Sequence, residues 1–362
     1  MAKNLRILSI TFLVTILIFS VYLNAWSTKE VDTYDFLNIG NGARAIGMGG
    51  AFVAVADDAT ATYWNPAGLG LLSKREMIAS RIELASNSFV SKDNIGSTHN
   101  YLSIAYPRLL GTRWGIGCSL IYFGVGQIQR IGTDDYGEPE PTNEFFQNSE
   151  FALIASCGRE AIKDWIWIGG SLKGMYHGLD DISGKGFGVD VGVLANLSPI
   201  LSAIFKSKSR NFWIFNRIGF GTAFQLNSSK RWNDVSGSTD PGLLREYYGI
   251  SFEPAIGENA RWIISIAADQ ARQQRLKISA GTEFRYKLQT IGGSDLFVVG
   301  RFGLRNQYIE TRQHGEYELA QLNYARQTTL GGGIQLDGIF LDYAFVWARL
   351  ANRHRISLRV RF

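Results

Sequence analysis

Apolar and polar residues alternate along the chain from residue 76 to the C-terminus, in segments of roughly ten residues. In the last segment the two kinds of residue fall on opposite faces, because side chains of a strand point alternately to its two sides. The apolar face carries Ile356, Leu358, Val360 and Phe362, and the polar face carries Arg355, Ser357, Arg359 and Arg361. This pattern predicts transmembrane strands, since each strand of a membrane barrel has one lipid-facing and one lumen-facing side.

Counting these segments predicts an all-β fold, a transmembrane antiparallel up-and-down β-barrel of about fourteen strands. The predicted strands span residues 76–89, 99–107, 113–127, 150–158, 165–177, 186–197, 212–226, 244–253, 261–268, 276–287, 296–305, 327–336, 339–348 and 353–362. Connections after even-numbered strands are mostly short, with 198–211 as the exception. The long polar connections after odd-numbered strands are 128–149, 227–243 and 306–326. Because outer-membrane barrels have short periplasmic turns and longer outer loops, we expect the N-terminus on the periplasmic side.

Aromatic residues and the two cysteines add detail to this barrel. Tryptophans gather near predicted strand ends, where an indole keeps its ring in the membrane interface and its N–H in water. These tryptophans are Trp165, Trp167, Trp213, Trp262 and Trp347. Cys118 and Cys157 fall on neighbouring strands and share the outward face. A cross-strand disulfide is one interpretation, and we favour the other, two small apolar residues that face lipid.

The first 25 residues have the features of a secretory signal peptide. Lys3 and Arg6 provide a positive start, and residues 7–21 are apolar except for small hydroxyl residues. Cleavage after Ala25 is the main prediction, and an uncleaved anchor helix is the alternative. Both interpretations imply export, which agrees with a bacterial outer-membrane location.

Composition and charge exclude several classes of protein. The 362 residues are 46% hydrophobic and 13% aromatic, which is too apolar for a disordered chain. A mean hydropathy of −0.03 argues against a bundle of membrane helices and is compatible with a barrel, whose strands average polar and apolar faces. The net charge is only +5 and no basic stripe follows the chain, so we expect no nucleic-acid partner.

No pattern in the sequence indicates catalysis, a metal or a cofactor. The four histidines, His99, His177, His314 and His354, are scattered and have no serine motif beside them. Cys-x-x-Cys and His-Glu-x-x-His spacings do not occur. We therefore expect that the protein is not an enzyme and that it has no cofactor and no metal site.

A small-residue motif lies between the signal peptide and the first predicted strand. It contains Arg44, the glycines Gly47, Gly49 and Gly50, the acidic pair Asp57-Asp58, and Asn65-Pro66-Ala67. These residues resemble the N-terminal hatch of the FadL family, outer-membrane transporters for long-chain fatty acids and other hydrophobic compounds. The Gly47-to-Phe52 run and Gly68-Leu69 resemble the PorV/PorQ branch more closely.

The resemblance implies a hatch at residues 26–75 that plugs the lumen of a barrel at 76–362. It also implies a function in protein export, as a type IX-like secretion accessory or in surface assembly, with exported proteins as partners. The alternative is a FadL-like passive transporter, whose partners would be hydrophobic small molecules. Either protein would contact outer-membrane lipid and the barrel assembly machinery, and the terminal Phe362 resembles the signal that this machinery recognises.

The carboxylates of the motif need partners, since an unpaired charge in a confined lumen is costly. We expect Asp57 and Asp58 to meet arginines on inward strand faces, with Asn65-Pro66 as a rigid turn. The candidate lumen arginines are Arg285, Arg301, Arg305, Arg359 and Arg361. They would either bind the carboxylate of an amphipathic ligand or join a network with Glu283, Asp342, Asp190 and the hatch acids. We favour the network.

Overall fold

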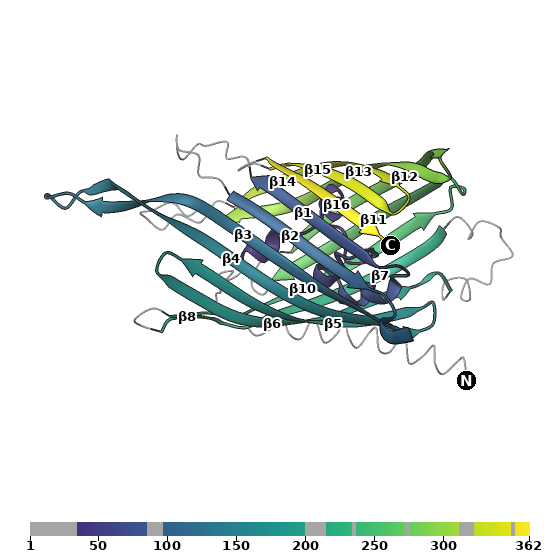
Figure 1. Ribbon diagram of the computed structural model, residues 1–362, viewed down its shortest axis with the longest axis horizontal. Coiled ribbons are helices and arrows are strands. Elements are labelled where there is room, and N and C mark those ends of the chain that lie inside the picture. The colour runs from purple at the N-terminus through teal and green to yellow at the C-terminus, as the bar shows by residue number, and fades with distance from the viewer. Residues whose placement is uncertain are drawn as a thin grey trace.

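The chain forms a closed antiparallel β-barrel with its N-terminal part inside (Figure 1). The computed structural model describes residues 35–84, 97–199, 215–233, 237–271, 276–310, 322–348 and 352–362. Sixteen strands make one sheet, and a β5–β6 pairing closes it. The short strands β8 and β9 are attached beside β6 and lie outside the closed order, so fourteen strands form the wall. The predicted fold class is therefore confirmed.

The strands of the wall follow one another around the barrel as the alternation predicts. Their bounds are β1 Glu76–Leu84, β2 Ser97–Tyr106, β3 Trp114–Thr133, β4 Pro139–Ile162, β5 Ile166–Leu179, β6 Ile182–Asn196, β7 Phe215–Asn227, β10 Leu243–Pro254, β11 Ala260–Ala271, β12 Lys277–Ile291, β13 Ser294–Glu310, β14 Leu322–Leu336, β15 Ile339–Trp347 and β16 Arg353–Arg361. The two extra strands are β8 Lys230–Trp232 and β9 Thr239–Asp240. Residue for residue, β1 pairs with β16 from Glu76↔Arg361 to Leu84↔Arg353, which joins the two ends of the barrel sequence.

Side-chain burial follows the period-2 pattern along each strand. In β15, Phe340, Asp342 and Ala344 are buried, whereas the residues between them are exposed. Leu341 and Ile356 are 51% and 55% exposed on the outer wall. This apolar outer surface is what a lipid bilayer would cover. Among the described residues, no helix is both long and apolar enough to cross a membrane.

The barrel has two different ends, which we call the short-turn end and the loop end. The short-turn end carries the connections at 163–165, 255–259, 292–293 and 337–338, together with Arg75 and the C-terminal Phe362. The loop end carries the other set of connections. There the β3–β4 hairpin extends far beyond the neighbouring strands (Figure 1).

This hairpin corrects the prediction of a loop at 128–149. Most of that segment is paired strand, with Ile128↔Phe146 and Gly132↔Glu140 in register around a turn at 134–138. The strands of this segment were not predicted because its composition is polar. An arm that extends into solvent has no lipid-facing side, so it needs no row of apolar residues. The predicted loop at 227–243 likewise contains β8 and β9, and the predicted first strand ends, within the described residues, at Leu84.

The interface position of the tryptophans stays a prediction, and it is wrong for Trp167. Trp262 and Trp347 are 38% and 48% exposed, but Trp167 is only 7% exposed and packs in the lumen core. Trp167 has the same parity as Ser171 and Lys173, which are also buried, so the alternation itself assigns it to the inner face. Trp213 lies outside the described residues. Cys118 and Cys157 are both free, on neighbouring strands of the outer wall.

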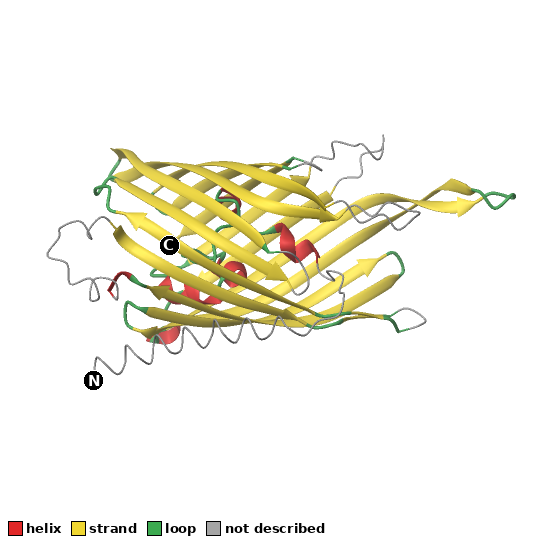
Figure 2. Ribbon diagram, turned by 180° about the vertical axis from the view of Figure 1, so that it is seen from behind, coloured by secondary structure: helices red, strands yellow, loops and turns green. Residues whose placement is uncertain are grey.

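Residues 35–72, which we call the inner segment, lie inside the barrel (Figure 2). The segment is made of short turns of helix: η1 Asp35–Ile39, α2 Ala43–Gly47, α3 Ala61–Trp64 and η2 Pro66–Leu71. It supplies much of the hydrophobic core, in which Phe36, Phe52 and Leu69 are at most 2% exposed. Its backbone is tied to the wall at several points, for example by the Ala43 N–H, which donates to Ser357 Oγ at 2.7 Å.

Small residues allow the inner segment to touch the wall backbone. A Cβ on Gly303 of β13 would lie 2.1 Å from the Gly49 nitrogen, and one on Gly169 of β5 would lie 2.4 Å from the Pro66 carbonyl carbon. A Cβ on Gly300, on the outer face of β13, would have no atom within 4 Å. The inward glycines are therefore required by the close approach of two backbones.

Candidate functional site

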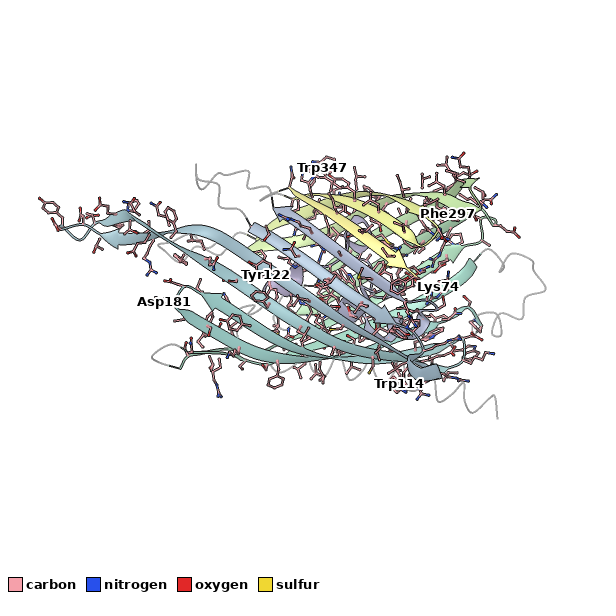
Figure 3. All side chains as sticks on the ribbon, viewed as in Figure 1. Lys74, Trp114, Tyr122, Asp181, Phe297 and Trp347 are labelled. Carbon is pink, nitrogen blue, oxygen red and sulfur yellow. The ribbon has the colours of Figure 1, made fainter. Side chains whose placement is uncertain are left out.

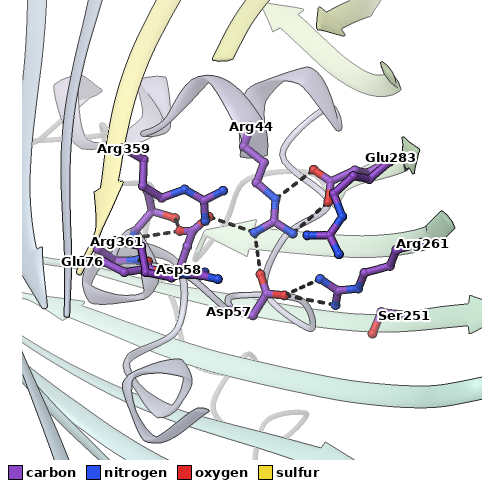
Figure 4. A network of polar contacts seen from close by, with 12 residues as sticks. Arg44, Asp57, Asp58, Glu76, Ser251, Arg261, Glu283, Arg359 and Arg361 are labelled. Carbon is purple, nitrogen blue, oxygen red and sulfur yellow. Dashed lines mark hydrogen bonds and ion pairs between the residues drawn. The ribbon is translucent and has the colours of Figure 1, made fainter. Parts of the chain in front are cut away.

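Arg44 of α2 is the centre of a buried ion-pair network between the inner segment and the barrel wall (Figure 4). Its Nε and Nη2 donate to the two oxygens of Glu283 on β12, at 2.8 and 2.9 Å. Its Nη1 donates to Asp57 at 2.5 Å and to Asp58 at 2.9 Å. The planar guanidinium thus joins three carboxylates, two from its own segment and one from the wall.

Wall arginines complete the network. Arg261 on β11 donates to Asp57 at 3.1 Å and to Glu253 at 2.8 Å. Arg301 on β13 bridges Glu283 at 2.7 Å and Asp342 at 2.8 Å.

Two more arginines lie at its edges: Arg359 is 3.5 Å from Asp58, and Arg217 is 4.0 Å from Glu253. The connected set contains five carboxylates and five guanidiniums, so its charges balance. The network interpretation that we favoured agrees with this arrangement.

An adjoining ion pair ties the first and last strands to the inner segment. Arg361 on β16 pairs with Glu76 on β1, and the other Glu76 oxygen accepts a hydrogen bond from the Ala59 N–H at 2.9 Å. Asp58 is also held locally, because it accepts hydrogen bonds from the Thr60 backbone and hydroxyl. The acidic pair therefore sits at the junction where the chain enters the barrel wall.

Burial and charge act in opposite directions on the groups of this junction. Burial alone would raise the pKa of the Asp57 carboxyl, but the Arg44 and Arg261 guanidiniums outweigh it and hold that pKa well below its usual range. Burial alone would likewise lower the pKa of Arg44, and its carboxylate neighbours raise it well above the ordinary value. Asp57 and Arg44 are thus fixed in their charged forms.

The second half of the motif adopts the predicted turn. Asn65 has an extended backbone with φ −166° and ψ 104°, and Pro66 begins η2. The Asn65 amide donates to the carbonyls of Val53, Val193 and Thr222 at 3.0 to 3.2 Å, so a single side chain joins the inner segment to β6 and β7. Its Oδ1 accepts from the Ala67 N–H.

The glycines of the motif serve the contact with β13 and β14. Gly49 and Gly50 have φ of +66° and +80°, a region that disfavours other residues. Gly47 lies against Arg301 and Gly331, and its carbonyl accepts from Thr329 Oγ1 at 3.1 Å. Space and backbone conformation therefore explain why these positions hold glycine.

A second, arginine-rich cluster lies on the loop-end side of the inner segment. Tyr63 is within electrostatic reach of Arg245 on β10, Arg305 on β13 and Arg355 on β16. Asp269 on β11 pairs with Arg305 at 2.8 Å and with Arg245 at 3.8 Å. Arg355 is 2% exposed and donates to the Gly40 carbonyl. Within the part of the chain that the structure describes, Arg355 has no carboxylate partner.

Buried polar groups without hydrogen-bond partners accompany Arg355. They are the Arg355 Nε, the His99 Nε2, and both side-chain atoms of Asn41, the residue after Gly40. Apolar groups lie on the same side of the barrel: Phe123 packs on His99 with ring centroids 6.5 Å apart, and Ile121 on β3 and Met175 on β5 are buried. This part of the lumen therefore holds apolar side chains beside buried polar atoms that have no protein partner, among them the Arg355 Nε donor.

Of the candidate lumen arginines, the structure brings only Arg359 to the hatch acids. Arg301 and Arg305 pair instead with wall carboxylates, Arg361 pairs with Glu76, and Arg285 donates to Gln335 at 3.3 Å. The expected inclusion of Asp190 is wrong, since it pairs with Lys173 at 2.7 Å. Arg261 and Arg355 were missed as candidates, although both lie on the polar face of a predicted strand. No group of three His, Cys, Asp or Glu side chains that would hold a metal ion occurs among the described residues.

Comparison with known proteins gives structural matches only. No protein-family model and no curated protein matches the chain. It is similar to the Pseudomonas putida toluene transporter TodX, with a TM-score of 0.52, 12% identity and coverage of 89% of this chain and 97% of that one. It is also similar to the CymD monoaromatic hydrocarbon channel, with a TM-score of 0.52, 11% identity and coverage of 89% of this chain and 97% of that one. A third similar structure is a Pseudomonas aeruginosa FadL homologue, with a TM-score of 0.51, 9% identity and coverage of 89% of this chain and 98% of that one.

At these identities the likeness concerns the fold. The chain has a closed fourteen-stranded antiparallel barrel like that of FadL-family channels. The resemblance of its motif to the PorV/PorQ branch stays a prediction.

Proposed function

We propose that the protein is an outer-membrane channel for the passive passage of hydrophobic compounds, long-chain fatty acids among them. The apolar outer wall fits a membrane location, and solved barrels of similar fold include a toluene transporter and a hydrocarbon channel. The resemblance of the N-terminal motif implies this function as the alternative to a secretion accessory. The N-terminal side of the barrel would face the periplasm.

The observation that carries this proposal is Arg355, which has no carboxylate partner among the described residues and lies beside the apolar lumen wall. A buried guanidinium without a carboxylate costs several kcal/mol, and a bound anion would recover much of that cost. Arg353, at the start of the same strand, also has no ion pair with a described carboxylate. A compound with a carboxylate and an alkyl chain would satisfy both the donors and the apolar wall.

The inner segment limits the routes by which a bound compound could leave the barrel. It fills the barrel between the Arg355 cluster and the short-turn end, where the Arg44 network fastens it. A compound held near Arg355 would therefore leave through the wall or past a displaced inner segment. The ion pairs of Arg44 would hold the segment in place until then.

The test is uptake by cells that lack their own transporter. Expression of the protein should raise the uptake of labelled oleate, and Arg355→Met should lower it about tenfold with no effect on a neutral alkane. The exposed Arg326→Met, in the loop-end half of β14, is the matched control. Absence of uptake for every hydrophobic probe would refute the proposal. If export of type IX cargo then depended on the protein, the secretion accessory function would replace it.

A further inference from the structure

Basic side chains gather along the rim of the short-turn end, between the start of β1 and the turn before β5. They are Lys74, Arg75, Arg108, Arg113, Arg159 and Lys163. Lys74 and Trp114 mark this end of the barrel in Figure 3. Arg159 is partly buried and the other five are exposed. None of the six forms an ion pair with a carboxylate in the described part of the chain. Neither proposed transport nor the Arg44 network uses them.

Two of these arginines lie over aromatic rings on the outer wall. The guanidinium carbon of Arg75 lies 4.1 Å from the centre of the Tyr106 ring, and that of Arg159 lies 5.2 Å from the Trp114 ring. Trp114 and Arg159 are direct cross-strand partners. Stacking orients the guanidinium while its N–H groups stay free, and the buried Arg159 Nε has no partner. Such a fork matches the oxygens of a phosphate.

An apolar row lies next to this basic rim, one step further along the strands. Paired positions run around the wall through Met77, Ile104, Cys118, Ala155 and Leu172. Met77, Ile104 and Leu172 are 42%, 49% and 66% exposed. The surface therefore presents phosphate donors and alkyl-binding area side by side. A free phosphate would use only the first, and a lipid would use both.

We propose that this rim binds the headgroup of an anionic phospholipid, with its acyl chains along the apolar row. The positive charge of the rim favours an anionic lipid over a neutral one. The opposite end of the same wall is acidic, with Asp134, Asp135, Glu138, Glu140 and Glu144 on the β3–β4 arm. The site goes beyond transport, because it lies on the outer wall and contacts no lumen group. Its role is to fix the height and orientation of the barrel in the bilayer.

The experiment measures lipid retention by the full-length protein. Purified barrel is exchanged into nanodiscs of phosphatidylcholine with a minor share of phosphatidylglycerol, and retained lipids are counted by native mass spectrometry. The variant is Arg75→Gln/Arg108→Gln/Arg159→Gln. The control, Lys185→Gln/Arg231→Gln/Arg326→Gln, removes the same charge at exposed loop-end positions. Heat-modifiable migration on gels shows that each barrel has folded.

Wild type and control should retain phosphatidylglycerol over phosphatidylcholine, and each rim arginine removed should weaken that preference about fivefold. Raising the salt from low to high concentration should release the lipid from the unmodified protein. Equal retention by the rim variant and wild type would overturn the site, and so would salt-insensitive retention by wild type. If inorganic phosphate raised the melting temperature as much as phosphatidylglycerol, the site would bind a free anion and the lipid assignment would be wrong. Oleate uptake is measured separately, so failure of the lipid site and failure of the transport proposal are distinguishable.

Discussion

The anchoring of the inner segment by its acidic pair gives the sharpest prediction. In Asp57→Ala/Asp58→Ala, Arg261 keeps Glu253 and Arg44 keeps Glu283, but Arg359 loses its ion pair. The connected network changes from balanced to a net charge of +2, since two of its five carboxylates are gone. The inner segment should therefore open locally while the barrel, whose ladder satisfies its own backbone, stays closed.

The size of the effect follows from burial. Asp58 and Arg359 have side chains 2% and 6% exposed, and breaking a buried pair by removing one partner costs about 3 to 5 kcal/mol. The 17% exposed Asp57 adds less. Opening of the segment should thus become roughly two to four orders of magnitude more frequent.

Amide hydrogen exchange of peptides from residues 43–56 is the assay, on protein that migrates as a folded barrel. Arg359→Met added to Asp58→Ala should restore part of the protection, because removal of both partners leaves no buried charge. Glu138→Ala/Glu140→Ala removes two exposed acids from the β3–β4 arm and should change nothing. If exchange in the Asp57/Asp58 variant stays at the wild-type rate, these carboxylates do not anchor the segment.

Three further predictions concern packing, pH and assembly. Gly303→Ala should lower the melting temperature, because it forces Gly49 away from β13 at a cost of about 1 to 3 kcal/mol. Gly300→Ala on the same strand is the control and should leave the melting temperature unchanged. Equal melting temperatures of the two variants would refute the close approach. Because the folded pKa of Asp57 is depressed, its stabilisation is complete above the ordinary carboxyl pKa of about 4 and fades only as pH falls further. The part of the protection that Asp57 provides, measured as the difference in exchange between wild type and Asp57→Ala, should therefore be pH-independent between pH 7 and 5, and a change of that difference in this range would contradict the argument. Deleting Phe362, whose backbone exchanges hydrogen bonds with Arg75, should reduce outer-membrane levels without blocking export, as fractionation and immunoblotting would show.

The sequence by itself determined the barrel. A side-chain period of two, sustained over fourteen segments, is enough to assign strands and faces, because lipid on one side and a polar lumen on the other leave no other choice at each position. The motif also indicated a compact segment, and its Asn65-Pro66 turn follows from local backbone preferences. Where one of the two environments was missing, as on the β3–β4 arm in solvent, the alternation disappeared and the strands were not predicted.

Only the tertiary structure decided which charges meet. Arg261 and Arg359 are far apart in sequence and reach the Asp57-Asp58 pair, and Glu283 reaches Arg44, because of strand register and the position of α2 in the lumen. Alternation predicts whether a side chain points into the lumen, but not its position along the barrel axis. The five candidate arginines therefore could not be distinguished as partners of the acidic pair. Height also separates the balanced Arg44 network from the unpaired Arg355, which lies two positions before Ser357 and four before Arg359 on the same inward face. The inner segment, by filling one part of the lumen, places Arg44 among carboxylates and leaves Arg355 buried without one among the described residues.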